Sequence, residues 1–600
     1  MAALAEILQT ARAHHQAGRL PEAASSYRQI LARDPANAAA LGLLGVLSCQ
    51  NGQPEEGVKY LKRSLKIRPY QAPGERAEAL NNLGNALRML AGSDPRLQAD
   101  AAANYREALR LHPSYPEAWN NLGRALLATG DAAGSIEAFE QALSVRPDSP
   151  QSLHGLASAL RAARRDAEAV GCLERALQLL PRFPEALNDW GLLTADAGEL
   201  EQGLSAIDRA LVFNPRLPEA LNNRGHVLRL LGRLDEAARS FDAALRARPL
   251  FPDALANLAT AFSDSGHPKE AELVLSRALC VDPSHAESHF TLGLLRLLQG
   301  DFASGWQEYE WRLKRRDAPP TRFNEPRWDG APLNGRSILL VAEQGLGDTL
   351  QFIRYAKHVK HRGGNVVVEC QPRLERVLSG IDGIDRIVAA GETLPRFDVW
   401  LPMLSLPAVL GEIPAGEIPA EVPYLRVNAS PVRTDGPIRV GLAWAGNPKY
   451  KGDRSRSLPL SRFAPLARLE SVEFYSLQRG PAADQTPPDG LRIVNIERED
   501  GGVEDTAAAL MNLDLLITSD SMPAHLAGAL GRPVWTLLPF APDFRWMLNR
   551  DDSPWYPTMR LFRQSSPGDW EGVMERVASA LSAWIVSTRS LPRNGAFEHA

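Results

Sequence analysis

The chain has 600 residues, a formal net charge of −4 at pH 7, and 44% hydrophobic and 23% charged residues. This composition is typical of a globular protein with several domains, and it excludes a largely disordered chain. The nearly even balance of charge gives no reason to expect nucleic acid as a partner, because nucleic acids favour strongly basic surfaces.

The beginning of the chain, MAALAEILQTARAHH, lacks the basic start and the unbroken apolar core of a signal peptide. No apolar run reaches the roughly 20 residues that cross a bilayer. We therefore expect a cytoplasmic protein without a membrane span. The four cysteines form no C-x-x-C pair, so the sequence indicates neither a zinc site nor a disulfide framework.

Prolines recur at a fixed spacing in the first half of the chain. They stand 34 residues apart at positions 113, 147, 181, 215, 249 and 283. This is the length of a tetratricopeptide repeat, a helix–turn–helix unit that stacks into an α solenoid and binds other proteins. In the fourth repeat Trp119, Leu122 and Gly123 reproduce the W-x-x-L-G opening. The sequence thus predicts an array of about nine repeats over residues 1–313.

Two irregularities interrupt this spacing. The interval between Pro69 and Pro113 is 44 residues, which predicts loop-like insertions, including AGSDPRLQAD in the third repeat. The last unit begins at His285 and ends in the aromatic GWQEYEWRL, with Trp306, Tyr309 and Trp311. Terminal repeats are atypical because one face meets something else. We expect this face to join the next domain, through a linker at 314–336.

A column of polar residues accompanies the first helices of the repeats. One position holds Asn82, Asn121, Asp189, Asn223 and Asn257, and the position before it holds Asn81, Asn120, Asn188 and Asn222. A carboxamide has two donors and an acceptor, so such a column can bind the main chain of a peptide. The column resembles the asparagine ladder of O-GlcNAc transferases, which implies protein binding by Asn82, Asn121, Asn223 and Asn257. The alternative is a hydrogen-bonded link between neighbouring repeats.

A different pattern starts at Ser337. SILLVAE is predicted to be a buried strand, followed by the turn QGLGD, an amphipathic helix and the strand NVVVECQ. DRIVAA and FDVWLPM are further strands, and the proline-rich stretch 413–437 is predicted to be an interdomain linker. A second series follows, with strands in RVGLAWAGN, VEFYSLQ, LRIVNI, DLLITSD and PVWTLLP. We expect two doubly wound α/β domains, 337–430 and 438–600, that face each other across a cleft.

Three segments carry a family resemblance. QGLGDTLQF (344–352), WAGNPKYKGDRSRS (444–457) and SDSMPAHLAGALGRPVWTLLP (519–539) resemble glycosyltransferase family 9, the heptosyltransferase-like enzymes. The resemblance covers about residues 337–582 and implies a GT-B fold of two Rossmann-like halves, with the acceptor bound by 337–430 and the donor by 438–600. The chain reads TSDS at 518–521, whereas the commoner pattern in these enzymes is S-x-D-T.

The resemblance also implies site residues. Asp348 occupies the position of the proposed catalytic base, although Asp348 and Gln351 also fit a helix N-terminal capping box. The helix that starts near Met522 offers N–H groups to a phosphate, with Ser521 and His525 as further donors, and simple capping or packing as their alternatives. The complete predicted donor-binding set is Gly345, Gly347, Asn447, Lys451, Arg454, Ser519, Asp520, Ser521 and His525.

Asp520 would repel a phosphate, so we assign it to positioning the backbone or the sugar. Lys451 and Arg454 are the cations chosen from a basic cluster that also contains Lys449 and Arg456. In FAPDFRWMLNR, Asp543, Arg545 and Trp546 are further candidates for the donor pocket, Trp546 having a core role as its alternative. No D-x-D sequence occurs, so no metal is expected, and the nucleotide sugar is a co-substrate and not a cofactor.

The function predicted from these features is a protein O-glycosyltransferase in the cytoplasm. The repeats would hold a protein, and the GT-B half would transfer a sugar to its Ser or Thr hydroxyl groups. A similarity to bacterial repeat–transferase proteins that modify flagellin implies flagellin as acceptor and a nonulosonic acid, carried by cytidine monophosphate, as donor. The residues themselves equally allow a nucleoside diphosphate sugar. Two alternatives remain open: transfer to a lipopolysaccharide or another glycan, and a scaffold without catalysis.

Overall fold

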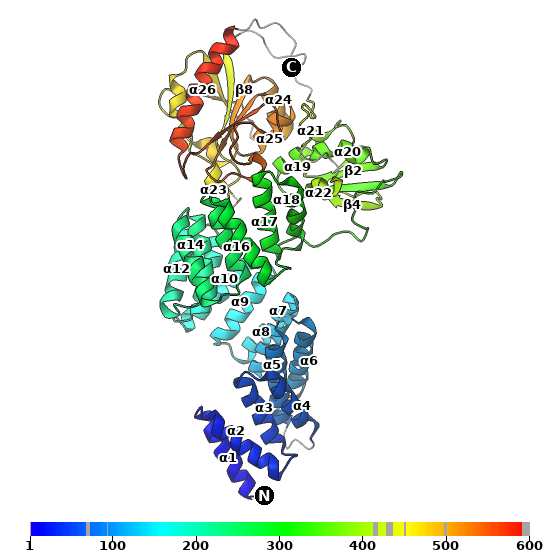
Figure 1. Ribbon diagram of the computed structural model, residues 1–600, viewed down its shortest axis with the longest axis vertical. Coiled ribbons are helices and arrows are strands. Elements are labelled where there is room, and N and C mark those ends of the chain that lie inside the picture. Colours follow the sequence, from blue (N-terminus) through cyan, green and yellow to red (C-terminus); the bar gives the residue numbers. More distant parts are fainter. Residues whose placement is uncertain are drawn as a thin grey trace. The chain divides into compact units, whose positions relative to one another are not determined.

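The computed structural model describes residues 2–67, 73–92, 94–411, 418–427, 436–448, 450, 452–496 and 501–590 (Figure 1). The chain forms two compact units, Met1–Pro249 and Leu250–Ala600. The second unit therefore contains the last repeats as well as both sheets. The predicted boundaries at 313, 336 and 430 stay predictions of domain organisation.

The first unit consists of antiparallel helix pairs (Figure 1). Its helices are α1 (Ala2–Gln16), α2 (Leu20–Arg33), α3 (Ala38–Gln50), α4 (Pro54–Lys66), α5 (Pro73–Ala91), α6 (Pro95–Leu111), α7 (Pro116–Ala128), α8 (Ala132–Val145), α9 (Pro150–Ala162), α10 (Asp166–Leu179), α11 (Pro184–Asp196), α12 (Leu200–Phe213), α13 (Pro218–Leu230) and α14 (Leu234–Ala247). Helices α7, α9, α11 and α13 each begin with proline. Proline has no backbone N–H, but the N–H groups of the first helical turn have no partner within the helix, so no hydrogen bond is lost.

Small residues let the paired helices approach each other around large rings. A Cβ atom on Gly123 would lie 2.8 Å from the ring of Phe139, and one on Gly155 would lie 2.3 Å from the same ring. Phe139 is 1% exposed, so it fills the space between its own repeat and the next one. The small residues of the repeat pattern therefore leave the space that its large aromatic residues fill.

The third repeat differs from the sequence prediction. The segment AGSDPRLQAD, expected to be a loop-like insertion, is largely helical, because α5 continues to Ala91 and α6 begins at Pro95. The Asp94 side chain accepts a hydrogen bond from the Arg96 N–H, at 2.9 Å, and so caps α6. The extra residues lengthen two helices by about one turn each instead of forming a loop.

Two more helix pairs open the second unit. They are α15 (Pro252–Asp264), α16 (Pro268–Val281), α17 (Ala286–Gln299) and α18 (Phe302–Tyr309), and the 3₁₀ turn η1 (Glu310–Lys314) follows. Helix α18 has only 8 residues. A Cβ atom on Gly293 would lie 2.6 Å from the backbone N of Tyr309, so α17 and α18 are in close contact at this point.

The first sheet contains four parallel strands in the order β3-β2-β1-β4. They are β1 (Ser337–Val341), β2 (Asn365–Cys370), β3 (Arg386–Ala389) and β4 (Val399–Pro402), with helices α19 (Leu346–Phe352), α20 (Ala356–Lys360), α21 (Glu375–Leu378) and α22 (Leu406–Leu410). The apolar runs of the sequence thus form strands where they were predicted. The single helix expected after the QGLGD turn is divided, because the 3₁₀ turn η2 (Ile353–Tyr355) separates α19 from α20.

The second sheet contains six parallel strands in the order β10-β9-β8-β5-β6-β7. They are β5 (Ile438–Ala443), β6 (Val472–Ser476), β7 (Ile493–Asn495), β8 (Leu515–Ser519), β9 (Val534–Leu538) and β10 (Met559–Arg563), with α23 (Asp453–Arg456), α24 (Val503–Met511), α25 (Met522–Ala529), α26 (Trp570–Ser590) and the 3₁₀ turn η7 (Phe544–Trp546). Strand β10 was not among the predicted strands. Its sequence MRLFR mixes apolar and basic residues, as suits a strand at the edge of a sheet.

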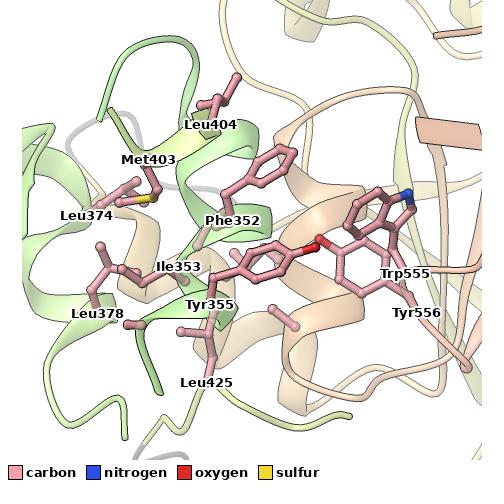
Figure 2. Packing of buried hydrophobic residues seen from close by; sticks show 14 of the residues in the cluster. Phe352, Ile353, Tyr355, Leu374, Leu378, Met403, Leu404, Leu425, Trp555 and Tyr556 are labelled. Atoms are coloured by element: carbon pink, nitrogen blue, oxygen red, sulfur yellow. The ribbon is translucent and has the colours of Figure 1, made fainter. Parts of the chain in front are cut away.

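One buried cluster runs from the last repeat through both sheets. It includes Trp306 and Tyr309 of α18, Phe352 of α19, and Trp555 of the loop between β9 and β10. Figure 2 shows Phe352 and Tyr355 pointing towards Trp555 and Tyr556, and the ring centroids of Phe352 and Trp555 are 5.8 Å apart. The second unit therefore has a shared core in addition to smaller cores on the outer faces of its sheets.

Arg354 also joins the two sheets. Its Nη1 donates to the carbonyl oxygens of Pro419 and Trp555, both at 2.7 Å, and its Nη2 donates to the hydroxyl of Tyr424 at 3.0 Å. Pro419 and Tyr424 lie in the segment 413–437 that was predicted to be a linker. Residues 418–427 of this segment contact both halves, because Tyr424 also donates from its backbone N–H to the carbonyl oxygen of Ala529, at 3.1 Å. Within the described ranges, no helix is long and apolar enough to cross a bilayer.

The packing around Phe139 predicts opposite effects for two glycine substitutions. Gly155→Ala should lower the free energy of unfolding by about 1–3 kcal/mol, because the added methyl group collides with the ring. Gly171→Ala in α10 is the matched control, since its Cβ meets nothing within 4 Å. It should raise stability by up to about 1 kcal/mol through helix propensity. Urea unfolding followed by circular dichroism measures both, and equal midpoints for the two variants would contradict the packing described.

Candidate active site

Predicted site residues from both α/β halves lie where helix α19 of the first half contacts helix α25 of the second half. Helix α19 follows strand β1 and α25 follows strand β8, so both begin at the carboxyl ends of parallel strands. A Cβ atom on Gly347 would lie 2.7 Å from Cδ2 of His525. Only glycine at position 347 lets the two helices approach this closely. The predicted residues Gly345, Gly347, Asp348 and His525 are therefore brought together.

Both carboxylate oxygens of Asp348 have partners. Oδ2 accepts a hydrogen bond from the backbone N–H of Gly345 at 2.7 Å, and Oδ1 forms an ion pair with Nη2 of Arg545. The capping box expected between Asp348 and Gln351 does not form. Gly345 is the N-cap of α19, Asp348 is its third helical residue, and Gln351 is buried and turned towards Arg545.

Arg545 is the centre of this arrangement. Its Nε donates to Oε1 of Gln351 at 2.8 Å, its Nη1 donates to Oδ1 of Asp543 at 2.7 Å, and its Nη2 pairs with Asp348. Burial alone would lower the pKa of the guanidinium, but the carboxylates of Asp543 and Asp348 outweigh it and the pKa is raised. Arg545 therefore stays charged, and it connects a loop of the second sheet to a helix of the first.

Asp520 lies beside this pair, at the end of β8. Its side chain is buried, and burial together with the neighbouring Asp543 raises its pKa from the ordinary value of 3.8 to about 6, although Arg456 acts in the opposite direction. The carboxyl group thus gains a proton in mildly acidic solution. A protonated carboxyl group can donate a hydrogen bond as well as accept one. The role assigned to Asp520 from the sequence, positioning the backbone or the sugar, stays a prediction.

His525 is a packed helix residue in this structure. It is 5% exposed, its Nδ1 lies 3.1 Å from the hydroxyl of Tyr556, and its ring stacks on Trp546 with centroids 5.4 Å apart. Burial and the nearby Arg545 lower its pKa well below the ordinary value, so the imidazole is neutral. The alternative interpretation of His525, packing, describes its surroundings, and Trp546 is likewise in the core.

The serines at the start of α25 are arranged differently from a simple cap. Ser521 is the N-cap residue, but its Oγ donates to the carbonyl oxygen of Ser519 at 3.2 Å and lies 3.3 Å from Oγ1 of Thr518. Oγ of Ser519 and Nε2 of Gln351 are buried and have no hydrogen-bond partner in the described part of the chain. Buried polar atoms normally have partners, so these two are candidates for contact with a ligand or a water.

In the loop after β5, Arg456 is a cation that the sequence prediction did not select. Asn447 and Arg454 are exposed, and Lys451 lies outside the described residues. Arg456 is half-buried, donates from Nε to Oδ1 of Asp453 at 3.2 Å, and lies 4.6 Å above the ring of Tyr450. Its charge acts on the pKa values of Asp520 and His525. Arg456 was part of the basic cluster in the sequence, and its spacing from Asp453 by three residues is the signal that distinguishes it.

The asparagine column makes hydrogen bonds between successive repeats. Nδ2 of Asn121 donates to Oδ1 of Asn81 at 2.9 Å, and Nδ2 of Asn223 donates to Oδ1 of Asn188 at 3.0 Å. The equivalent pair between these is His154 with Asp189, at 2.8 Å. Each of the asparagine bonds uses one of the two hydrogens of the carboxamide. The geometry is that of the alternative weighed from the sequence, a link between neighbouring repeats.

One position interrupts this column. Gly155 stands where the partner of Asn120 would be, and it has no side chain to offer. Oδ1 of Asn120 is accordingly buried without a hydrogen-bond partner among the residues that the structure describes. The steric demand of Phe139 on Gly155 thus outweighs one hydrogen bond in the column.

Of the four predicted peptide-binding residues, Asn82, Asn121, Asn223 and Asn257, all are half-buried.

Comparison with known proteins supports the repeats. Residues 8–72, 99–150, 122–186 and 188–254 match one tetratricopeptide repeat family, and residues 228–289 match a second one. The first half of the chain therefore contains tetratricopeptide repeats, and small parallel sheets follow them in the sequence. In the described ranges, no group of three or more His, Cys, Asp or Glu residues is arranged to hold a metal ion.

A curated relative and two solved structures are similar to this chain. Protein FlbA of Caulobacter vibrioides is 27% identical over 364 residues, which are 53% of this chain and 59% of FlbA, so the chain covers less than two thirds of that relative. The APC/C hetero-tetramer Cut9–Hcn1 has 16% identity and a TM-score of 0.38 over 48% of this chain and 55% of its own. MamA has 24% identity and a TM-score of 0.25 over 28% and 93%. Neither structural likeness carries an argument about function.

The raised pKa of Asp520 predicts a pH-dependent stability. Between about pH 4 and the folded-state value of about 6, the unfolded chain loses this proton and the folded chain keeps it. The free energy of unfolding therefore falls as pH rises through this window and stays reduced above it. Asp520→Asn removes the effect, so the variant should be more stable than the wild type by about 1–3 kcal/mol at neutral pH.

This advantage should largely disappear below about pH 4, where Asp520 is protonated in the unfolded as well as in the folded wild type. Thermal unfolding of both proteins at two pH values measures the difference directly. Other titrating groups are common to both proteins and cancel in the comparison. A stability difference that is the same at acidic and neutral pH would contradict the raised pKa.

Proposed function

We propose that this chain is a protein O-glycosyltransferase whose transfer site lies at the meeting of α19 and α25. The observation that carries the proposal is Arg545, a buried guanidinium held between Asp348 and Asp543 at the carboxyl ends of both sheets. The repeats would hold the acceptor protein, and a nucleotide sugar would be the donor. The resemblance to glycosyltransferase family 9 in residues 337–582 supports the same assignment.

The donor phosphate would bind beside Arg545. A guanidinium binds phosphate oxygens as readily as carboxylates, and the start of α25 has no side-chain cap. Oγ of Ser519 and Nε2 of Gln351, both without partners among the described residues, would donate to oxygens of the ligand. Arg456 would add a second positive charge. A phosphate in this position competes with Asp348 for Arg545.

That competition gives Asp348 its role. Once the phosphate takes over the guanidinium, Oδ1 of Asp348 is released and accepts the proton of a Ser or Thr hydroxyl group. The hydroxyl oxygen forms a bond to the anomeric carbon of the sugar, and the bond from that carbon to the phosphate oxygen breaks. The electron pair leaves with the nucleotide, whose negative charge Arg545 and Arg456 stabilise. No metal ion is part of this scheme.

The acceptor is proposed to be a protein because of the repeats. The column of amides in the first unit offers one further N–H for each of the Asn121 and Asn223 side chains, which suits a main-chain carbonyl group. Flagellin as the acceptor in the cytoplasm, and a nonulosonic acid as the sugar, follow only from the resemblance to repeat–transferase proteins. Transfer to a lipopolysaccharide would not require protein-binding repeats, so a protein acceptor accounts for more of the chain.

A second candidate, a scaffold without catalysis, is favoured by one observation. Both oxygens of Asp348 have partners within the protein, so the carboxylate is engaged in the structure without a donor. Under this interpretation the Asp348–Arg545 pair would only join the two sheets. The two candidates differ in what happens when the negative charge of Asp348 is removed.

The test is an incubation of the purified chain with candidate proteins and a panel of nucleotide sugars, followed by intact mass measurement. The wild type should add sugar-sized increments to a protein. Asp348→Asn should lower the rate by at least about 100-fold, because the general base is lost. The matched control is Asp505→Asn, because Asp505 caps α24 through the N–H of Gly502, at 2.8 Å, as Asp348 caps α19.

Asp505→Asn should transfer sugar at the wild-type rate. If both variants lose activity equally, the effect comes from helix capping, and Asp348 is not the base. If a protein binds the repeats but gains no mass with any donor, the scaffold interpretation holds. Sugar transfer to a glycan but to no protein would support the lipopolysaccharide alternative.

A further inference from the structure

The aromatic residues of the last repeat contact the two segments that carry the proposed site. Trp306 of α18 packs edge-to-face against Phe352, with ring centroids 5.7 Å apart and an interplanar angle of 90°. It packs in the same way against Phe544, at 5.6 Å and 88°. Trp306 is 6% exposed, so these rings and the neighbouring side chains of the shared core cover nearly all of its surface. Trp311, by contrast, stacks on His289 within the repeat, at 3.8 Å.

These two contacts have a specific location in the chain. Phe352 lies one helical turn after Asp348 on α19, and Phe544 directly precedes Arg545 in η7. One indole thus touches the neighbours of both members of the ion pair. A rigid ring in this place restrains the separation of α19 and η7, which is the separation of Asp348 and Arg545. Neither segment is held by a covalent link to the other.

Tyr309 provides a second support. Its hydroxyl accepts a hydrogen bond from Nε2 of Gln344 at 3.1 Å, in the turn that leads to α19. Its ring lies 5.8 Å from that of Phe544. Burial raises the pKa of Tyr309 to about 12, and the charges of Arg545 and Asp348 both act on it. The hydroxyl therefore stays protonated.

The turn between α17 and α18 supports the same loop from another side. A Cβ atom on Gly300 would lie 2.6 Å from Cε of Met547. Phe302 contacts Trp555 at a centroid distance of 6.3 Å, and Nε1 of Trp555 donates to the carbonyl oxygen of Arg545 at 2.8 Å. The loop that carries Arg545 is thus bounded by the last repeat as well as by α19.

We infer that Trp306 and Tyr309 are positioning residues for sugar transfer, so that the last repeat completes the transfer site. This inference rests on the function proposed above. It assigns to the repeats a second task beside holding a protein, namely fixing the separation of Asp348 and Arg545. The helix pair α17–α18 is then an integral part of the transferase, and residues 314–600 alone have an incomplete site.

The test compares Trp306→Ala, Trp306→Phe and Trp119→Ala in the full-length chain. Trp119, on α7 of the first unit, is the matched control, because its indole bonds to the carbonyl oxygen of Pro113 in the turn before α7, at 2.8 Å. The first readout is amide hydrogen exchange in segments 346–352 and 543–547. Trp306→Ala should raise exchange by about tenfold or more in both segments, and Trp119→Ala should change neither.

The second readout is steady-state kinetics of sugar transfer. Trp306→Ala should lower kcat by at least about tenfold and leave KM for the protein acceptor unchanged, because a misplaced pair affects the reaction and not the capture. Trp306→Phe keeps an aromatic ring and should recover most of kcat. Tyr309→Phe, which removes only the hydroxyl bound by Gln344, should lower kcat in the same direction and serves if Trp306→Ala does not fold.

Each outcome decides a separate point. Unchanged exchange in both segments, or a raised KM with unchanged kcat, would overturn the positioning role. If the wild type transfers no sugar to any acceptor, the proposed function fails, and the exchange measurement still decides whether Trp306 holds the two segments. If kcat falls equally in Trp119→Ala, the effect is a general consequence of damage to the repeats and the inference is wrong.

Discussion

The second unit is organised around one buried positive charge. The guanidinium of Arg545 cannot be left unpaired away from water, so Asp348, Asp543 and Gln351 must all be within hydrogen-bonding distance of it. Asp348 and Gln351 belong to the first sheet's helix, and Asp543 belongs to the second sheet's loop. The two α/β halves are therefore fixed to each other where their parallel strands end. The close contact of Gly347 with His525 lies at the same junction.

The same requirement explains why the last helix pair is part of the second unit. A buried ion pair is sensitive to small displacements, and its energy depends on excluding water from its surroundings. Trp306, Phe352 and Phe544 supply that apolar surrounding, and they belong to three different parts of the chain. The cluster seen in Figure 2, with Phe352 facing Trp555, continues the same core on the other side. The last repeat thus forms part of the buried core of the second unit.

The sequence predicted those features that depend on local pattern. The 34-residue spacing indicated the repeats, and the apolar runs at Ile338 and Leu515 indicated buried strands. It could not show the partners of Arg545, because Gln351 is 194 residues away along the chain and the contact depends on how two sheets pack. For the same reason it left two interpretations of the asparagine column open. The bond between Asn121 and Asn81 exists only once the repeats are stacked.

The central claim is that Arg545 is shared between Asp348 and the phosphate of a donor. Titration calorimetry with a panel of CMP, CDP, UDP and GDP tests it most directly on the wild type, Asp348→Asn and the control Asp505→Asn. At least one nucleotide should bind, and Asp348→Asn should bind it about tenfold more tightly than the other two proteins, because a competitor for Arg545 has been removed. Equal or weaker affinity in Asp348→Asn, or binding of none of the nucleotides, would contradict the account.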